Sequence, residues 1–188
     1  MPPKVKVTKK DIIDTSLELC RKHGTGALNA RSIAAALGCS TQPVFSNFAT
    51  MDELSSAVTA AAYGLYFGFL EREAKSGKYP QYKSLGMAYI RFAKEEKELF
   101  KLLFMCDRTG EEPAPAADFD ASVKIIMEAN GLSKEKAILL HMEMWACVHG
   151  IATMFATSFL ELDEATVSTM LTDVYQGVRA RHVLEDNK

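Results

Sequence analysis

The segment CSTQPVFSNF, residues 39–48, gathers small polar side chains around a proline. A Gln side chain has the shape for a bidentate hydrogen bond to adenine, and Ser or Thr hydroxyls can bond to several bases or to phosphates. The first turn of a helix also attracts phosphate, because its backbone N–H groups have no partner within the helix. We therefore predict that Thr41, Gln42 and Ser46 lie on the outer face of a short helix that contacts double-stranded DNA. The alternative, from spacing alone, is a polar corner of an all-helical bundle.

The proline fits the start of this helix. If Ser40 is the N-cap, Pro43 falls in the first turn, where a missing N–H removes no helical hydrogen bond. Its ring can then pack against a sugar or a thymine methyl group. We expect Val44, Phe45 and Phe48 to form the buried side of the helix.

Two further helix patterns precede this segment. Thr8 is a candidate N-cap for a helix that Gly24 can close, and Asn29 is a candidate N-cap for ARSIAAALG. Gly38 supplies a tight turn before the third helix. Three short helices within residues 8–48, with such a turn, are typical of a helix-turn-helix motif. In that motif the N-terminal residues of the second helix of the pair reach base edges in the major groove.

The charge distribution agrees with a DNA-binding head. The net charge is -2, which by itself argues against general nucleic-acid binding. Residues 1–50, however, hold seven Lys or Arg against three Asp or Glu, whereas the remaining residues hold 15 basic against 21 acidic ones. A basic N-terminal region beside an acidic remainder is expected if the N-terminal region binds an anion. The alternative is a chance asymmetry of the solvated surface. The predicted DNA contacts are Ser40, Thr41, Gln42, Pro43, Phe45, Ser46, Asn47, Asn29, Arg31, Lys9 and Lys10.

The rest of the chain also predicts helices, because no alternating Val, Ile and Thr run suggests a strand. Ser133 and Asp163 are candidate N-caps. We therefore predict an all-α fold, with a three-helix helix-turn-helix DNA-binding domain in residues 1–50 and a helical effector-binding and dimerisation domain in residues 51–188. Apolar periodicity places the later helices at about residues 52–75, 81–94, 97–105, 121–130, 134–159 and 164–181.

Residues 8–58 resemble the DNA-binding domain of the TetR family of transcriptional regulators. The matching positions are Ile33-Ala34, Leu37-Gly38, Ser40, Val44-Phe45, Asn47-Phe48 and Glu53-Leu54. Two positions depart from the family pattern, which usually has Tyr in place of Phe45 and often Lys in place of Met51. Both departures remove phosphate contacts, and we expect the basic arm from Lys4 to Lys10 to replace them.

The stretch MEMWACVHGIATMF is similar to the Trp-x-x-x-His-Gly signature of one class of TetR C-terminal domain, with Trp145, His149 and Gly150 at the matching positions. The resemblance implies an all-helical domain that dimerises through its last two helices and holds a small-molecule pocket. The expected dimer contacts lie on the apolar face of the last helix, at Val167, Met170, Leu171, Val174 and Val178.

The same stretch suggests where a ligand would bind. His141, Trp145 and His149 follow at i, i+4 and i+8 and share one helix face. A lining rich in Met and aromatic residues suits an apolar ligand, although ordinary core packing is the alternative for each residue. A shared metal ion is not expected, because the two histidines lie about 12 Å apart along a helix. The predicted ligand-binding residues are Trp145, His149, Met142, His141, Phe104, Met105, Tyr66, Tyr89 and Phe92.

Other classes of protein find little support. The sequence has no GxSxG, no Gly-rich phosphate loop and no HExxH, so we expect neither an enzyme nor a cofactor. It has no leader pattern and no apolar run of roughly 18 residues, so we expect a cytoplasmic protein with no membrane partner. We therefore predict a homodimeric TetR-type repressor that binds palindromic operator DNA and is released by a small-molecule effector. The alternatives are a regulator without such an effector, or an activator.

Overall fold

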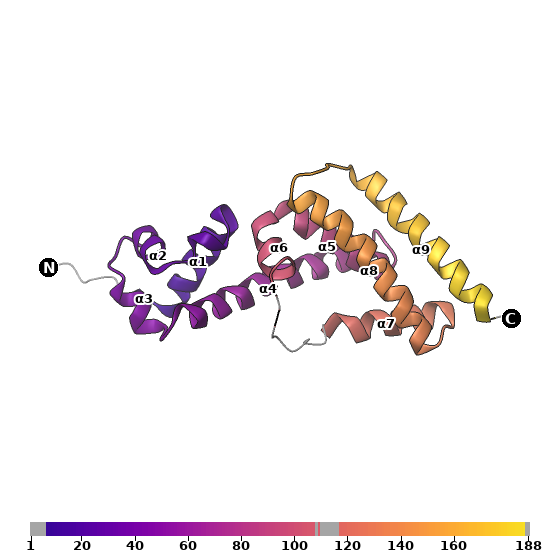
Figure 1. Ribbon diagram of the computed structural model, residues 1–188, viewed down its shortest axis with the longest axis horizontal. Coiled ribbons are helices and arrows are strands. Elements are labelled where there is room, and N and C mark those ends of the chain that lie inside the picture. Colours follow the sequence, from indigo (N-terminus) through magenta and orange to yellow (C-terminus); the bar gives the residue numbers. More distant parts are fainter. Residues whose placement is uncertain (1–6, 108, 110–116, 187–188) are drawn as a thin grey trace. The chain divides into compact units, whose positions relative to one another are not determined.

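The computed structural model describes residues 7–107, 109 and 117–186, and every regular element within these residues is helical (Figure 1). This confirms the predicted all-α fold. The elements are α1 (Lys9–His23), the 3-10 turn η1 (Thr25–Ala27), α2 (Ala30–Ala36), α3 (Gln42–Asn47), α4 (Met51–Ser76), α5 (Gln81–Glu95), α6 (Lys97–Phe104), α7 (Ala117–Asn130), α8 (Lys134–Ala156) and α9 (Glu164–Asp186).

The described residues form two compact units. The first unit contains those within 1–67 and 96–106, so α1, α2, α3, α6 and most of α4 belong together. The second contains those within 68–95 and 107–188, and it holds α5, α7, α8 and α9. The chain thus leaves the first unit through α4 and returns to it for α6. The predicted division of functions after residue 50 stays a prediction.

One apolar cluster holds the first unit together. It draws on every helix of the helix-turn-helix region and on the first half of α4, and its buried members are Ile12, Ile33, Val44, Phe48, Leu54 and Val58. A helix of six or seven residues is not stable by itself in water. The short helices α2 and α3 therefore depend on this burial.

The predicted N-caps of the first two helices are confirmed. Thr8 Oγ1 accepts a hydrogen bond from the Asp11 N–H at 3.1 Å, and the Asp11 carboxylate accepts one from the Thr8 N–H at 2.9 Å, which completes a capping box. Asn29 Oδ1 accepts from the Ser32 N–H at 2.9 Å. Each cap satisfies backbone groups that the helix itself leaves without partners.

The predicted start and buried face of α3 are partly wrong. The N-cap is Thr41 and not Ser40, because the first helical hydrogen bonds end on the Thr41 carbonyl, and no side chain caps the helix. Pro43 still lies in the first turn, as expected. Phe45 was predicted to be buried but is 56% exposed. Val44 and Phe48, one turn apart, already fill the inward face, and a residue next to Val44 points about 100° away from it.

Helix α6 belongs to the first unit because it contacts α1. The Arg21 guanidinium binds both carboxylate oxygens of Glu96, the residue before α6, with the Nε–Oε2 distance at 2.6 Å. Glu96 is only 6% exposed, so this pair is partly withdrawn from water. Gly24, the predicted end of α1, is confirmed as its C-cap and lies close to the carboxylate of Glu98.

The second unit is a bundle in which α8 packs against α5, α7 and α9. Helices α5 and α8 approach closely at Gly86, where a Cβ added to the glycine would lie 3.2 Å from a methyl group of Val148. The caps predicted at Ser133 and Asp163 are confirmed, because each side chain accepts from a first-turn N–H. Helix α8 ends at Ala156, earlier than predicted, before Ser158 adopts a φ of 55°.

Helix α8 is also long and apolar enough, by length and composition alone, to cross a bilayer. The core helix of a water-soluble bundle has the same composition, because it is covered on several sides. Its buried side chains include Leu140, Met144, Val148, Ile151 and Phe155. These contribute to the core of the second unit.

The turn after α1 gives a test of backbone strain. Gly24 has φ 75° and ψ -178°, a region that is essentially restricted to glycine, and an added Cβ would lie 2.7 Å from Glu98 Oε2. We expect Gly24→Ala to lower the free energy of unfolding by about 1–3 kcal/mol, measured by urea denaturation. Gly26→Ala is the matched control, since a Cβ there meets nothing within 4 Å. Equal stability of the two variants would contradict the prediction.

Candidate nucleic-acid interface

The outer face of α3 carries the predicted base-reading side chains. Gln42, Phe45 and Ser46 are exposed, whereas Thr41 and Asn47 are half-buried. The Ser46 hydroxyl donates to the Gln42 carbonyl at 2.8 Å, and the Asn47 amide donates to the carbonyl of the residue four positions earlier, also at 2.8 Å. The Gln42 side chain makes no hydrogen bond to any described residue. The amide group of Gln42 is therefore available for hydrogen bonds to the edge of a base.

Two predicted contacts on α2 differ in what they can offer. Asn29 is the N-cap of that helix, so its carbonyl oxygen is already committed to the backbone. Arg31 is exposed and makes no ion pair with a carboxylate in the described part of the chain. Its guanidinium is therefore available for a phosphate.

The two predicted lysine contacts at the start of α1 each contact an acid. The Lys10 ammonium binds the Asp14 carboxylate one turn along the helix, and this bond raises the pKa of Lys10. The Lys9 ammonium lies 2.9 Å from Glu53 Oε1, at the start of α4, and this bond is the main cause that lowers the pKa of Glu53. A phosphate would have to compete with a carboxylate for each lysine.

The predicted ligand-binding residues are divided between the two units. In the first unit, the rings of Tyr66 and Phe104 meet edge to face at 5.2 Å, and Met105 is exposed. In the second unit, the Phe92 ring meets Phe69 edge to face at 5.3 Å, and both are buried. These contacts account for the aromatic side chains as packing within each unit.

The residues of the predicted ligand-binding face of α8 have separate surroundings. The Trp145 indole stacks on the His149 ring at 5.1 Å, and the Tyr89 hydroxyl lies 2.9 Å from His149 Nδ1. His141 lies 2.9 Å from the Tyr82 hydroxyl instead. Trp145 and Met142 are 46% and 45% exposed, so neither side chain lies in the core.

A hollow of about 320 Å³ lies in the second unit. Its volume is at the lower end for small-molecule pockets. Its lining includes two basic and two acidic side chains, so it offers a ligand balanced charge, together with one aromatic ring, that of Phe155. Its lining residues are Met87, Ile90, Arg91, Lys94, Glu95, Phe155, Leu162, Glu164 and Val167, and none of them is among the predicted ligand-binding residues.

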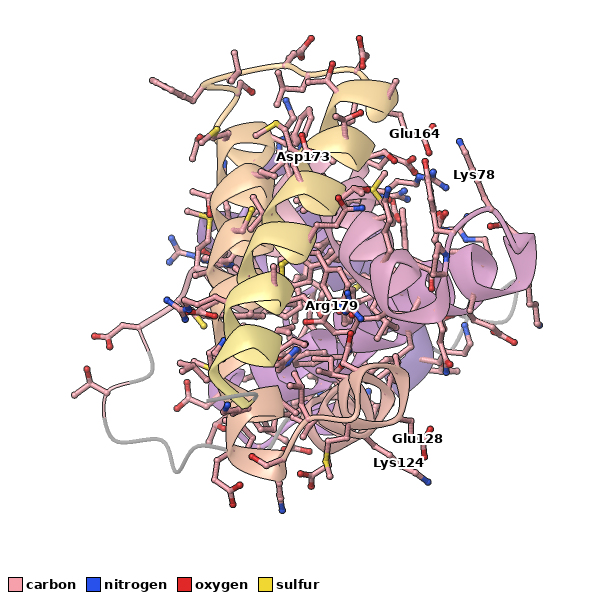
Figure 2. The ribbon with its side chains drawn as sticks, turned by 90° about the vertical axis from the view of Figure 1, so that its right-hand side faces the viewer. Lys78, Lys124, Glu128, Glu164, Asp173 and Arg179 are labelled. Atoms are coloured by element: carbon pink, nitrogen blue, oxygen red, sulfur yellow. The ribbon has the colours of Figure 1, made fainter. Side chains whose placement is uncertain are left out.

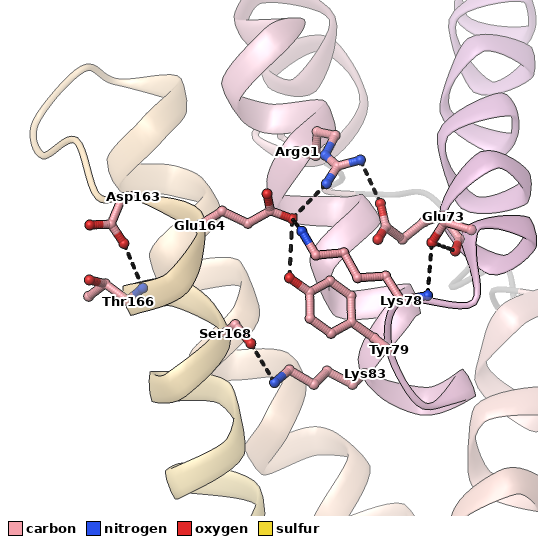
Figure 3. Close-up of polar contacts among 10 residues, drawn as sticks. Glu73, Lys78, Tyr79, Lys83, Arg91, Asp163, Glu164, Thr166 and Ser168 are labelled. Atoms are coloured by element: carbon pink, nitrogen blue, oxygen red, sulfur yellow. Dashed lines mark hydrogen bonds and ion pairs between the residues drawn. The ribbon is translucent and has the colours of Figure 1, made fainter.

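Arg91, one of these lining residues, binds two carboxylates (Figure 3). Its two terminal nitrogens lie 2.7 Å from the buried Glu73 carboxylate and 2.9 Å from the Glu164 carboxylate. The same Glu164 oxygen accepts bonds from Lys78 at 2.9 Å and from the Tyr79 hydroxyl at 3.1 Å. No local pattern could have indicated this network, because its members come from α4, α5, α9 and the α4–α5 connection.

The predicted dimer residues on α9 separate into two groups. Val167 and Leu171 are buried within the chain, so they belong to the core of the second unit. Met170, Val174 and Val178 keep part of their surface exposed. Figure 2 shows α9 running alongside α8, whose exposed apolar side chains are Leu139, Met142 and Trp145.

Metal ligation finds no support in the described residues, where no three His, Cys, Asp or Glu side chains are placed to hold an ion.

Comparisons with known proteins define the class. The sequence profile described as "Tetracyclin repressor-like, C-terminal domain" matches residues 82–175, half of the chain. No curated protein sequence matches the chain. A protein of unknown function from Rhodococcus sp. RHA1 shares the fold, with a TM-score of 0.72 and 20% identity over 97% of this chain and 99% of that chain. A TetR-family member from Streptomyces coelicolor A3 has a TM-score of 0.60 and 18% identity over 88% and 96%.

These findings identify an all-helical regulator of the helix-turn-helix class. The chain belongs to the tetracyclin repressor-like, or TetR, family, and it is a TetR-type transcriptional regulator. The narrower class that the Trp-x-x-x-His-Gly signature indicates stays a prediction.

The two half-buried histidines of α8 predict a pH dependence. Burial lowers the pKa of His141 and that of His149, so the folded chain binds fewer protons at these sites than the unfolded chain does. Stability should therefore fall as the pH drops below about 6.5, by at most about 1.4 kcal/mol per pH unit for each histidine. Urea denaturation between about pH 8 and pH 5.5 measures this effect. The double variant His141→Gln, His149→Gln should show a flatter profile, and an equally steep one would contradict the prediction.

Proposed function

We propose that this chain is a homodimeric repressor that binds palindromic operator DNA through the exposed face of α3. The observation that carries the proposal is the Gln42 amide, which is exposed in the first turn of α3 and has no hydrogen-bond partner among the described residues. In a helix-turn-helix protein this position reaches base edges in the major groove. An adenine presents the donor and acceptor pair that such an amide matches.

The surroundings of Gln42 support contacts with the sugar-phosphate backbone. Among the described residues, no carboxylate pairs with the Arg31 guanidinium, and the Ser46 hydroxyl donates to the Gln42 carbonyl but accepts no hydrogen bond. Thr41, Pro43, Phe45 and Asn47 complete the proposed contact surface, with Phe45 exposed enough to touch a sugar or a thymine methyl. Lys9 and Lys10 join it when a phosphate displaces their carboxylate partners.

Dimer formation is proposed from the apolar side chains left exposed on α8 and α9. Met142 and Trp145 on α8 and Met170 on α9 remain uncovered in the single chain. A symmetric pair would bury these groups and present two copies of α3 to half-sites about 34 Å apart, one turn of DNA. Palindromic operators follow from that symmetry.

We further propose release by a small-molecule effector, which must bind the DNA-incompetent state more tightly to shift the equilibrium. A second candidate is a regulator without such an effector. It is favoured by the contacts that already occupy Tyr89, Trp145 and His149, and by the small volume and the charged lining residues of the hollow at Arg91.

The role of Gln42 can be tested by fluorescence anisotropy on labelled DNA from the region upstream of the protein's own gene. Gln42→Ala should weaken specific binding by about 1–3 kcal/mol, because a bidentate base contact is lost. Binding to scrambled DNA should change little. The matched control is Gln81→Ala, an exposed glutamine in the second unit. Equal binding of wild type and Gln42→Ala would contradict the assigned role.

The dimer surface can be tested by sedimentation velocity. Met142→Arg should raise the dimer dissociation constant by about tenfold or more, since an unpaired charge in an apolar interface is costly. Phe159→Arg is the control, because Phe159 is 81% exposed but lies in the connection between α8 and α9. A dimer that survives the Met142 change and dissociates with the Phe159 change would move the interface to that connection.

A further inference from the structure

Glu53 serves two helices at once. It lies in the first turn of α4, where its Oε2 accepts a hydrogen bond from the Ala49 N–H at 2.8 Å and its own N–H donates to Thr50 Oγ1 at 3.1 Å. These two bonds cap the start of α4. Its other oxygen, Oε1, lies 2.9 Å from the ammonium of Lys9, the first residue of α1.

Lys9 is held at the corner where α1, the end of α3 and the start of α4 meet. Its ammonium lies 4.5 Å from the ring centroid of Phe48, the C-cap of α3, in addition to its bond with Glu53. The side chains of Lys9 and Glu53 are 51% and 44% exposed, so the pair is open to solvent. Met51, the first residue of α4, packs against the apolar cluster and offers no charge at this corner.

We propose that Glu53 keeps the Lys9 ammonium in an ion pair and so limits the affinity of the first unit for DNA phosphates. This inference rests on the proposed DNA-binding function. In the free chain the carboxylate cancels the charge of an ammonium that lies 4.5 Å from the ring centroid of Phe48, the C-cap of α3. Glu53 is thus a positioning residue, and it makes one phosphate contact conditional on opening an ion pair.

The exposure of the pair makes this exchange feasible. An ion pair that is half open to water is weak, so a DNA phosphate can compete for the ammonium. The cap on α4 does not depend on the charge, because a glutamine oxygen can accept the same N–H bond. Glu53→Gln therefore frees Lys9 while it leaves the start of α4 intact.

The experiment measures the binding of a mixed-sequence DNA duplex by anisotropy over a series of salt concentrations. Each phosphate that the protein neutralises adds about 0.9 to the slope of log K against log salt. Glu53→Gln should steepen this slope by about 0.9 and tighten binding by about eightfold at 0.1 M salt, with the gain vanishing near 1 M. The double variant Lys9→Gln, Glu53→Gln should return to the wild-type slope.

The matched control is Glu71→Gln, which also removes one acid and frees a lysine, Lys75, from an exposed pair along α4, but in the second unit and outside the proposed DNA surface. The inference is overturned if this control steepens the slope as much as Glu53→Gln does, or if the double variant keeps the gain. Absence of any binding by the wild-type chain, even at low salt, would overturn the proposed function itself.

A second measurement follows the ammonium itself. On the mixed-sequence duplex, the NMR signal of the Lys9 ammonium should shift in Glu53→Gln, where a phosphate becomes its partner, and should change much less in the wild-type chain, where Glu53 remains its partner. Equal shifts in the two proteins at saturating DNA would overturn the inference.

Discussion

The burial of Val44 and Phe48 is the constraint on which the DNA-binding surface depends. Helix α3 has six residues, and a helix of that length does not form by itself in water. No side chain caps its start at Thr41, so packing alone holds it. Once Val44 and Phe48 point inward, the helical geometry turns Gln42 and Ser46 outward. The proposed recognition face is therefore a consequence of the core beneath it.

Charge in this unit is less available than its composition suggests. Among the basic residues of positions 1–50, Lys9, Lys10 and Arg21 contact carboxylates, whereas Arg31 contacts none in the described part of the chain. The excess of positive charge in the sequence thus overstates the number of cations that meet a phosphate without competition. Affinity for DNA depends on which of these ion pairs a phosphate can open. The Arg21 pair is harder to open than the two lysine pairs, because its acid, Glu96, is buried.

In the second unit, residue types alone do not distinguish a ligand site from an ordinary core. Met and aromatic side chains line both pockets and cores, so the composition of α8 is compatible with either. In the structure, Trp145 stacks on His149, and the Tyr89 hydroxyl gives His149 Nδ1 a hydrogen-bond partner without a ligand. The hollow in the same unit is built around Arg91, a residue that no pattern on α8 indicates.

The sequence by itself determined the all-helical fold, the helix caps at Thr8, Asn29 and Ser133, and the family, because these depend on contacts within one or two turns of a helix. Only the tertiary structure decided that Phe45 is exposed and that α6 joins the first unit. Two ion pairs connect separate helices of the first unit. Lys9 and Glu53 are 44 positions apart in the sequence, and Arg21 and Glu96 are 75 positions apart. Local periodicity carries no information on such pairs, since their distance is fixed by how separate helices pack.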